Sequence, residues 1–167
     1  MSQITLKGNP IQVNGKLPEV GSLAPGFRLV NADLQDVVLK DFAGKKKVLN
    51  IFPSVDTPTC AMSVKKFNDY AREHDDVVML MISADLPFAM KRFCGNEGLD
   101  NVVTLSMMRG RNFSKDYGVL MENGPLAGIA ARACVVLGID NTVLHAELVA
   151  ELGDEPDYEA ALAALAV

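Results

Sequence analysis

The sequence has no long apolar run and no dense cluster of one charge. Its 167 residues carry 16 Lys and Arg against 21 Asp and Glu, which gives a net charge of −5. The longest basic run is the three lysines at 45–47, whereas phosphate binding needs clustered cations. No segment approaches the roughly 20 apolar residues that cross a bilayer. We therefore expect neither a nucleic-acid surface nor a membrane span.

Candidate metal ligands are also scarce. The chain has three cysteines and two histidines, and His74 and His145 lack the spacing of zinc ligands, so we expect no metal site. An odd number of cysteines argues against a disulfide framework and directs attention to single thiols. The segment MSQITLKGNP lacks the basic-then-apolar layout of a secretory signal, so we expect a cytoplasmic protein.

The hydrophobic pattern predicts one α/β domain over 1–167. Apolar residues alternate in 4–15 on both sides of a turn at Gly8 to Pro10, which predicts a peripheral β-hairpin. The runs KVLNIF (47–52) and VVMLMIS (77–83) are typical of strands buried on both faces of a sheet. A helical pattern lies between them, so we expect two parallel strands joined by a right-handed crossover.

Local signals predict the remaining elements and complete a central mixed sheet flanked by helices. These are a short strand pair within 27–44, a helix opened by Pro87 and closed by Gly95, a strand over 101–106, a helical turn near 111–118, a hairpin over 130–149 that turns at 138–141, and a C-terminal helix with Pro156 in its first turn.

Cys60 lies where the helix after the first buried strand should begin. Thr57 suits the N-cap and Pro58 the first helical position, so Cys60 falls in the first turn. Free backbone N–H groups and the positive end of the helix dipole favour an anion there, and for cysteine that anion is the nucleophilic thiolate. The alternative is a buried small hydrophobe, because Cys60 shares a helix face with Val64 and Phe67. The hydroxyls of PSVDTPT favour the reactive interpretation, and no Cys-x-x-Cys is present.

These residues resemble a known family. Pro53, Thr57 and Cys60 match the pattern Pro-x-x-x-Thr-x-x-Cys of the peroxiredoxins, and Arg132 matches their active-site arginine at the start of a late strand. The segments GNP, DFAGKKKVLNIFPSVDT, ISADLPFAMKRFCG, YGV, GPLAGIAARA and EPDYEAALA are similar to those of bacterial thiol peroxidases, which are atypical two-cysteine peroxiredoxins. The resemblance spans the chain and implies a thioredoxin-like fold.

The resemblance also implies roles for these residues. Cys60 corresponds to the peroxidatic cysteine, which attacks a hydroperoxide and becomes a sulfenic acid. Thr57 corresponds to the hydroxyl that contacts peroxide and sulfur, Arg132 to the cation that stabilises the thiolate, and Pro53 to the residue that shields the pocket. Cys94 corresponds to the resolving cysteine, which forms a disulfide with Cys60 in the same chain.

The resemblance further implies thioredoxin as the reductant, a homodimer, alkyl hydroperoxides among the substrates, a part in antioxidant defence, and no cofactor. The residues alone leave two points open. Cys94, next to Phe93, reads equally well as a core thiol, and Cys134 shares a strand face with Arg132 but lies in an apolar run typical of a core. If Cys94 is the resolving cysteine, we expect one or both helix ends to unwind before the disulfide can form.

Overall fold

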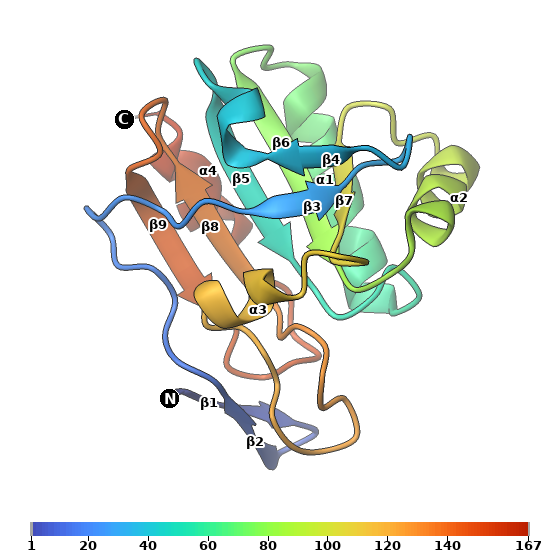
Figure 1. Ribbon diagram of the computed structural model, residues 1–167, viewed down its shortest axis with the longest axis vertical. Coiled ribbons are helices and arrows are strands. Elements are labelled where there is room, and N and C mark those ends of the chain that lie inside the picture. The colour runs from blue at the N-terminus through green and yellow to red at the C-terminus, as the bar shows by residue number, and fades with distance from the viewer. Residues whose placement is uncertain (1, 167) are drawn as a thin grey trace.

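A computed structural model describes residues 2–166, and a seven-stranded mixed sheet forms its centre (Figure 1). The strand order is β4-β3-β7-β6-β5-β8-β9, with β5, β6 and β7 parallel and the other pairs antiparallel. The bounds are β3 Arg28–Val30, β4 Asp36–Val38, β5 Lys46–Ile51, β6 Val77–Ser83, β7 Val103–Ser106, β8 Ala133–Leu137 and β9 Val143–Leu148. The predicted parallel pair and the hairpin over 130–149 are confirmed.

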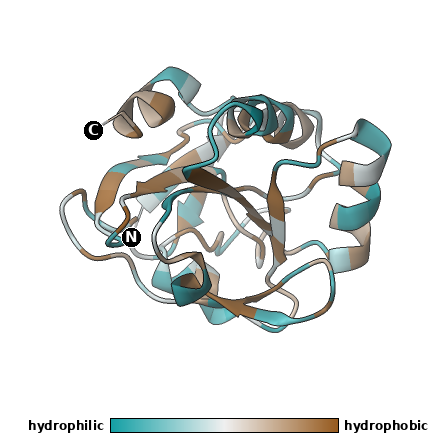
Figure 2. Ribbon diagram, turned by 90° about the horizontal axis from the view of Figure 1, so that it is seen from above, coloured by the Kyte–Doolittle hydropathy of each residue, from teal (hydrophilic) through white to brown (hydrophobic). Residues whose placement is uncertain are grey.

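Helices cover both faces of the sheet. They are η1 Leu39–Phe42, α1 Pro58–Arg72, α2 Pro87–Glu97, α3 Asn112–Asp116 and α4 Tyr158–Ala164. α1, α2 and α4 contribute Phe67, Met90 and Ala161 to one apolar cluster, whereas Phe113 of α3 belongs to the cluster on the opposite face. Figure 2 shows the hydrophobic strands between these layers. This double burial explains why β5 and β6 are almost continuously apolar.

The predicted N-terminal hairpin is present as a separate two-stranded sheet, β1 Ser2–Leu6 and β2 Asn9–Val13. Its turn is formed by Lys7 and Gly8, whose φ angles of 51° and 81° are those that a two-residue hairpin turn requires. Pro10 was predicted in the turn but lies in β2 opposite Thr5. A proline is compatible with a strand that has a free edge.

Two predicted helix boundaries were wrong. α2 continues through Gly95 to Glu97 and ends at Gly98, whose φ of 65° gives a left-handed C-cap. Pro156 lies outside α4, because the N-cap is Asp157, whose carboxylate accepts a hydrogen bond from the backbone N–H of Ala160. Within residues 2–166, no helix has the length and apolar character needed to cross a membrane.

Gly118, just after α3, provides a test of the packing between this segment and the backbone of Lys16. Its φ is +67°, and an added Cβ would overlap the backbone of Lys16. Gly118→Ala should therefore lower the free energy of unfolding by about 2 kcal/mol or more. Gly44→Ala is the matched control, because Gly44 has a φ of +87° with open space around it and should cost about 1 kcal/mol. Equal losses for the two variants in denaturant titrations would contradict this packing.

Candidate active site

Cys60 is the third residue of α1 and is completely buried. The helix begins where the sequence predicts, with Thr57 as an extended N-cap and Pro58 as the first residue. The loop from β5 therefore delivers the thiol to the positive end of a 15-residue helix.

Arg132 meets Cys60 inside the protein. Arg132 directly precedes β8, is 2% exposed, and donates a hydrogen bond from Nη1 to Cys60 Sγ at 3.0 Å. Its Nε donates to the backbone oxygen of Leu152, also at 3.0 Å. The guanidinium is thus held between a sulfur atom and a carbonyl, and 72 positions of sequence separate it from the thiol.

Thr57 and Pro53 lie in the loop between β5 and α1. The Thr57 hydroxyl donates to the backbone oxygen of Ser54 at 3.2 Å and makes no side-chain cap bond to the helix. The predicted N-cap position is right. Pro53, in the same loop, is buried. The start of α1 therefore keeps backbone N–H groups that its N-cap side chain does not occupy.

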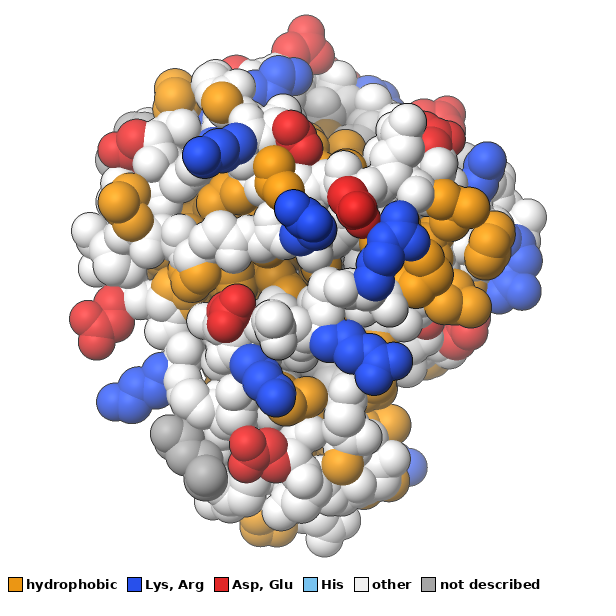
Figure 3. All heavy atoms as spheres, in the orientation of Figure 1, with side chains coloured by type: hydrophobic (Ala, Val, Ile, Leu, Met, Phe, Trp, Pro, Cys, Tyr) orange, Lys and Arg blue, Asp and Glu red, His pale blue; other side chains and the backbone are white. Residues whose placement is uncertain are grey.

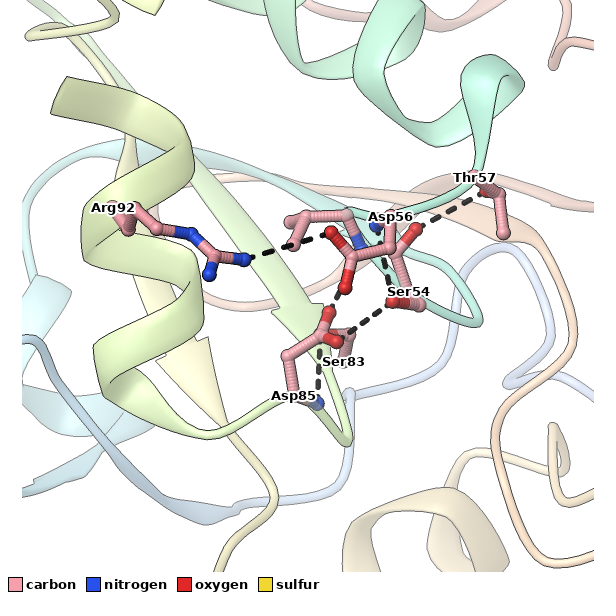
Figure 4. Close-up of polar contacts among 7 residues, drawn as sticks. Ser54, Asp56, Thr57, Ser83, Asp85 and Arg92 are labelled. Carbon is pink, nitrogen blue, oxygen red and sulfur yellow. Dashed lines mark hydrogen bonds and ion pairs between the residues drawn. The ribbon is translucent and has the colours of Figure 1, made fainter. Parts of the chain in front are cut away.

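Asp85 fixes the loop and was missed by the sequence reasoning (Figure 4). One carboxylate oxygen accepts from Ser54 Oγ at 2.8 Å, and the other accepts from the Val55 N–H at 2.8 Å and from Ser83 Oγ at 2.6 Å. An exposed ion pair between Arg92 of α2 and Asp56, at 3.8 Å, adds little to this network.

The sequence did contain a signal for Asp85. This residue follows β6, and the loop that carries Ser54 follows β5. Because β5 and β6 are parallel neighbours, the loops at their carboxyl ends lie together at one edge of the sheet.

Cys94 lies in the last turn of α2 and is half-buried as a free thiol. It packs against the apolar cluster that also contains Cys60. Burial, with a smaller contribution from the charge of Asp100, raises the pKa of Cys94 to about 11. The structure therefore brings Cys94 to the same side of the sheet as Cys60 and leaves the two sulfurs unbonded.

Cys134 lies inside the same apolar cluster, as the second residue of β8, opposite Asn50. It is a free thiol with no exposed surface, and burial raises its pKa, as does the charge of Glu147 to a smaller extent. Within residues 2–166, no group of three or more His, Cys, Asp or Glu side chains is arranged to hold a metal ion.

Comparisons with known proteins identify the family and the relatives of this chain. The redoxin family matches residues 19–162. A thiol peroxidase from Mycobacterium bovis (strain ATCC BAA-935 / AF2122/97) is 54% identical over 165 residues, which is 99% of each chain. The crystal structure of a peroxiredoxin-like protein from Aquifex aeolicus superimposes with a TM-score of 0.92 at 36% identity, covering 98% of this chain and 95% of the other.

A thiol peroxidase from Chromobacterium violaceum has a TM-score of 0.90 at 27% identity, over 98% of this chain and 95% of its own. The likeness to these proteins, in sequence and in structure, thus extends over nearly the whole length of this chain. The chain therefore belongs to the redoxin family, among the peroxiredoxins that include the thiol peroxidases.

Proposed function

We propose that this protein reduces hydrogen peroxide and organic hydroperoxides with Cys60 as the peroxidatic residue. The observation that carries the proposal is the 3.0 Å contact between the buried Arg132 guanidinium and Cys60 Sγ at the start of α1. A buried cation and a helix N-terminus both favour a negative sulfur, and the thiolate is the nucleophilic form.

In the proposed first step, the thiolate of Cys60 attacks one oxygen of the hydroperoxide and the O–O bond breaks. The sulfur loses two electrons and becomes a sulfenic acid, while the second oxygen leaves and takes a proton to give an alcohol, or water from hydrogen peroxide. Arg132 donates to the negative charge on sulfur and on the departing oxygen. The Thr57 hydroxyl orients the peroxide, and the buried Pro53 keeps water from the sulfur.

In the proposed second step, Cys94 attacks the sulfenic sulfur of Cys60, water leaves, and an intramolecular disulfide forms. The two thiols sit on different helices and both helix ends are held. Thr59 Oγ1 donates to the Gly153 oxygen at 2.9 Å, and the N–H of Leu99 donates to the Cys94 oxygen at 2.9 Å. We infer that one or both of these ends unwinds before the disulfide forms.

A hollow beside the Asp85 loop has room for the organic part of a hydroperoxide. It has a volume of about 660 Å³, and its lining combines apolar residues such as Leu86, Met107 and Ile129 with the polar Arg111, Ser114 and Lys115. Cys60 and Arg132 are not among the residues that line it. Figure 3 shows hydrophobic side chains gathered on the surface around α2. Leu86, the N-cap of this helix, is 51% exposed and Phe88 in its first turn is 62% exposed. Thioredoxin as the reductant, a homodimer, one domain over 1–167 and a cytoplasmic location complete the proposal.

Single cysteine variants test the cycle. Cys60→Ser should abolish peroxide-dependent NADPH oxidation in the presence of thioredoxin and its reductase, because the nucleophile is lost. Cys94→Ser should reduce steady turnover by at least about tenfold while leaving one round of Cys60 oxidation intact. Cys134→Ser is the matched control and should turn over like the wild type.

Mass spectrometry of peptides from the oxidised wild type should contain the Cys60–Cys94 disulfide. Full turnover by Cys94→Ser would reject the resolving assignment, and an oxidised form that joins Cys60 to Cys134 would name a different partner. Turnover many times greater than the amount of protein also separates an enzyme from a sensor that is oxidised once.

Because burial raises the pKa of Cys94, the stability of the folded last turn of α2 depends on pH. We call the reduced protein with the last turn of α2 folded the closed form. In it the Cys94 thiol has a pKa of about 11, against an ordinary value of 9.0 when the thiol is solvated. The stability of the closed form is therefore fully present below about pH 9 and falls as the pH rises towards 11. Hydrogen-exchange protection of the α2 amides in the reduced protein should decrease over this range. In the Cys94→Ser variant the same protection should decrease less. Identical profiles would contradict the argument.

Thr59 tests whether the first turn of α1 must open. Thr59→Val removes the hydrogen bond to Gly153 at almost constant volume, so the turn should unwind more readily. Disulfide closure, followed by acid quenching and mass spectrometry, should become about two- to tenfold faster. Thr142→Val, in the β8–β9 turn, is the matched control. Unchanged or slower closure in Thr59→Val would show that this contact does not limit the opening.

A further inference from the structure

Residues 149–153 form a strap between the N-terminal hairpin and the Cys60 site. On the hairpin side, the N–H of Thr5 donates to the Ala150 oxygen, and the N–H of Leu152 donates to the Thr5 oxygen, both at 2.8 Å. These bonds join the small β1–β2 sheet to a segment that follows β9. The hairpin is thus attached close to the catalytic groups, although it is not part of the main sheet (Figure 1).

Glu151 is the centre of this attachment. One carboxylate oxygen accepts from the Gly8 N–H and from Thr5 Oγ1, each at 3.0 Å, and the other accepts from the Gly153 N–H at 3.1 Å. These donors, above all the N–H groups of Gly8 and Gly153, lower the pKa of Glu151 to about 2. The carboxylate therefore remains charged at every pH at which the enzyme would work, and it binds the hairpin turn and the strap together.

The other side of the strap faces the reacting groups. The Leu152 oxygen of the strap accepts a hydrogen bond from Arg132 Nε, and the Val149 N–H donates one to the Arg132 backbone oxygen, both at 3.0 Å. Arg132 is therefore held by the strap at its side chain and at its backbone. A planar guanidinium whose Nε–H is fixed has a fixed direction for its Nη1 donor, which is the atom that contacts Cys60.

We propose that Glu151 is a positioning residue that acts through Leu152 on Arg132. By tying the strap to the hairpin turn, Glu151 holds the Leu152 carbonyl where it orients the guanidinium toward Cys60 Sγ. Without this tie, Arg132 keeps its charge but samples other orientations, and small displacements of a catalytic group have large effects on rate. This inference rests on the proposed function and assigns the hairpin a part in it.

A double-mutant cycle separates positioning from simple stabilisation. We would measure the second-order rate of Cys60 oxidation by hydrogen peroxide in single-turnover mixing for wild type, Glu151→Ala, Arg132→Lys and the double variant. Glu151→Ala should be about tenfold slower. Lysine lacks the Nε–H that Leu152 accepts, so adding Glu151→Ala to Arg132→Lys should cause less than about a twofold further loss.

Glu122→Ala is the matched control. Glu122 is an exposed carboxylate beside the same hairpin, joined to it by its backbone N–H, which donates to the Gln12 oxygen, and it lies outside the strap. This variant should oxidise at the wild-type rate. Equal fold-losses from Glu151→Ala in the wild-type and Arg132→Lys backgrounds, or no loss in either, would overturn the positioning role. Oxidation of Cys60 at the wild-type rate in the Arg132→Lys variant would instead reject the proposed role of Arg132 itself.

Thr5→Val and Glu151→Gln keep the test decisive if Glu151→Ala folds poorly. Thr5→Val removes one donor to the carboxylate, and the glutamine keeps one acceptor oxygen, so each should slow oxidation about two- to fivefold. Both should also lose this effect in the Arg132→Lys background. Additive effects from these milder variants, in proteins with unchanged circular dichroism, would equally overturn the inference.

Discussion

The burial of the Arg132 guanidinium is the constraint on which the rest of the site depends. A cation taken out of water costs several kcal/mol unless it is paired and its donors are satisfied. Here the partners are Cys60 Sγ from α1 and the Leu152 carbonyl from the strap, and Arg132 itself leads into β8. A thiolate compensates the buried charge better than a neutral thiol does. In the proposed function, one contact therefore both compensates the buried charge and favours the nucleophilic form of the sulfur.

This arrangement suits the first step of the proposed cycle and opposes the second. Cys60 has no exposed surface and Cys94 is half-buried on another helix, which is why the proposed disulfide step includes local opening. The bonds from Thr59 to Gly153 and from Leu99 to Cys94 at the two helix ends are neutral and worth about 1 kcal/mol each, whereas Asp85 holds the preceding loop with two bonds to a carboxylate, from Ser54 and Val55. In the proposed cycle, neutral backbone-directed bonds are among those that break at the helix ends, and bonds to a carboxylate hold the loop that must return to its place.

The sequence revealed the parts of this site that depend on local signals. A proline and a threonine at fixed spacing located the start of α1, and apolar runs located β5 and β6. The contact between Arg132 and Cys60 joins residues 72 apart, so its identification came from the family resemblance and not from spacing. Leu152 acts through a backbone carbonyl, which any residue possesses, and therefore leaves no trace in the sequence. The end of α2 was misplaced because both Gly95 and Gly98 could have closed it, and backbone conformation chose the second.

The three cysteines lie in different surroundings, and on these rests the proposal that Cys60 is the thiol that reacts. Cys60 and Cys134 are both completely buried in one apolar cluster. Cys134 lies in mid-strand, where burial raises its pKa and holds it as a neutral thiol. Cys60 is buried in the same apolar cluster, but it also lies in the first turn of a helix, and the Arg132 guanidinium contacts its sulfur at 3.0 Å. Burial that silences one thiol strengthens the electrostatic contacts of the other, because a charge-assisted hydrogen bond gains strength as water is excluded.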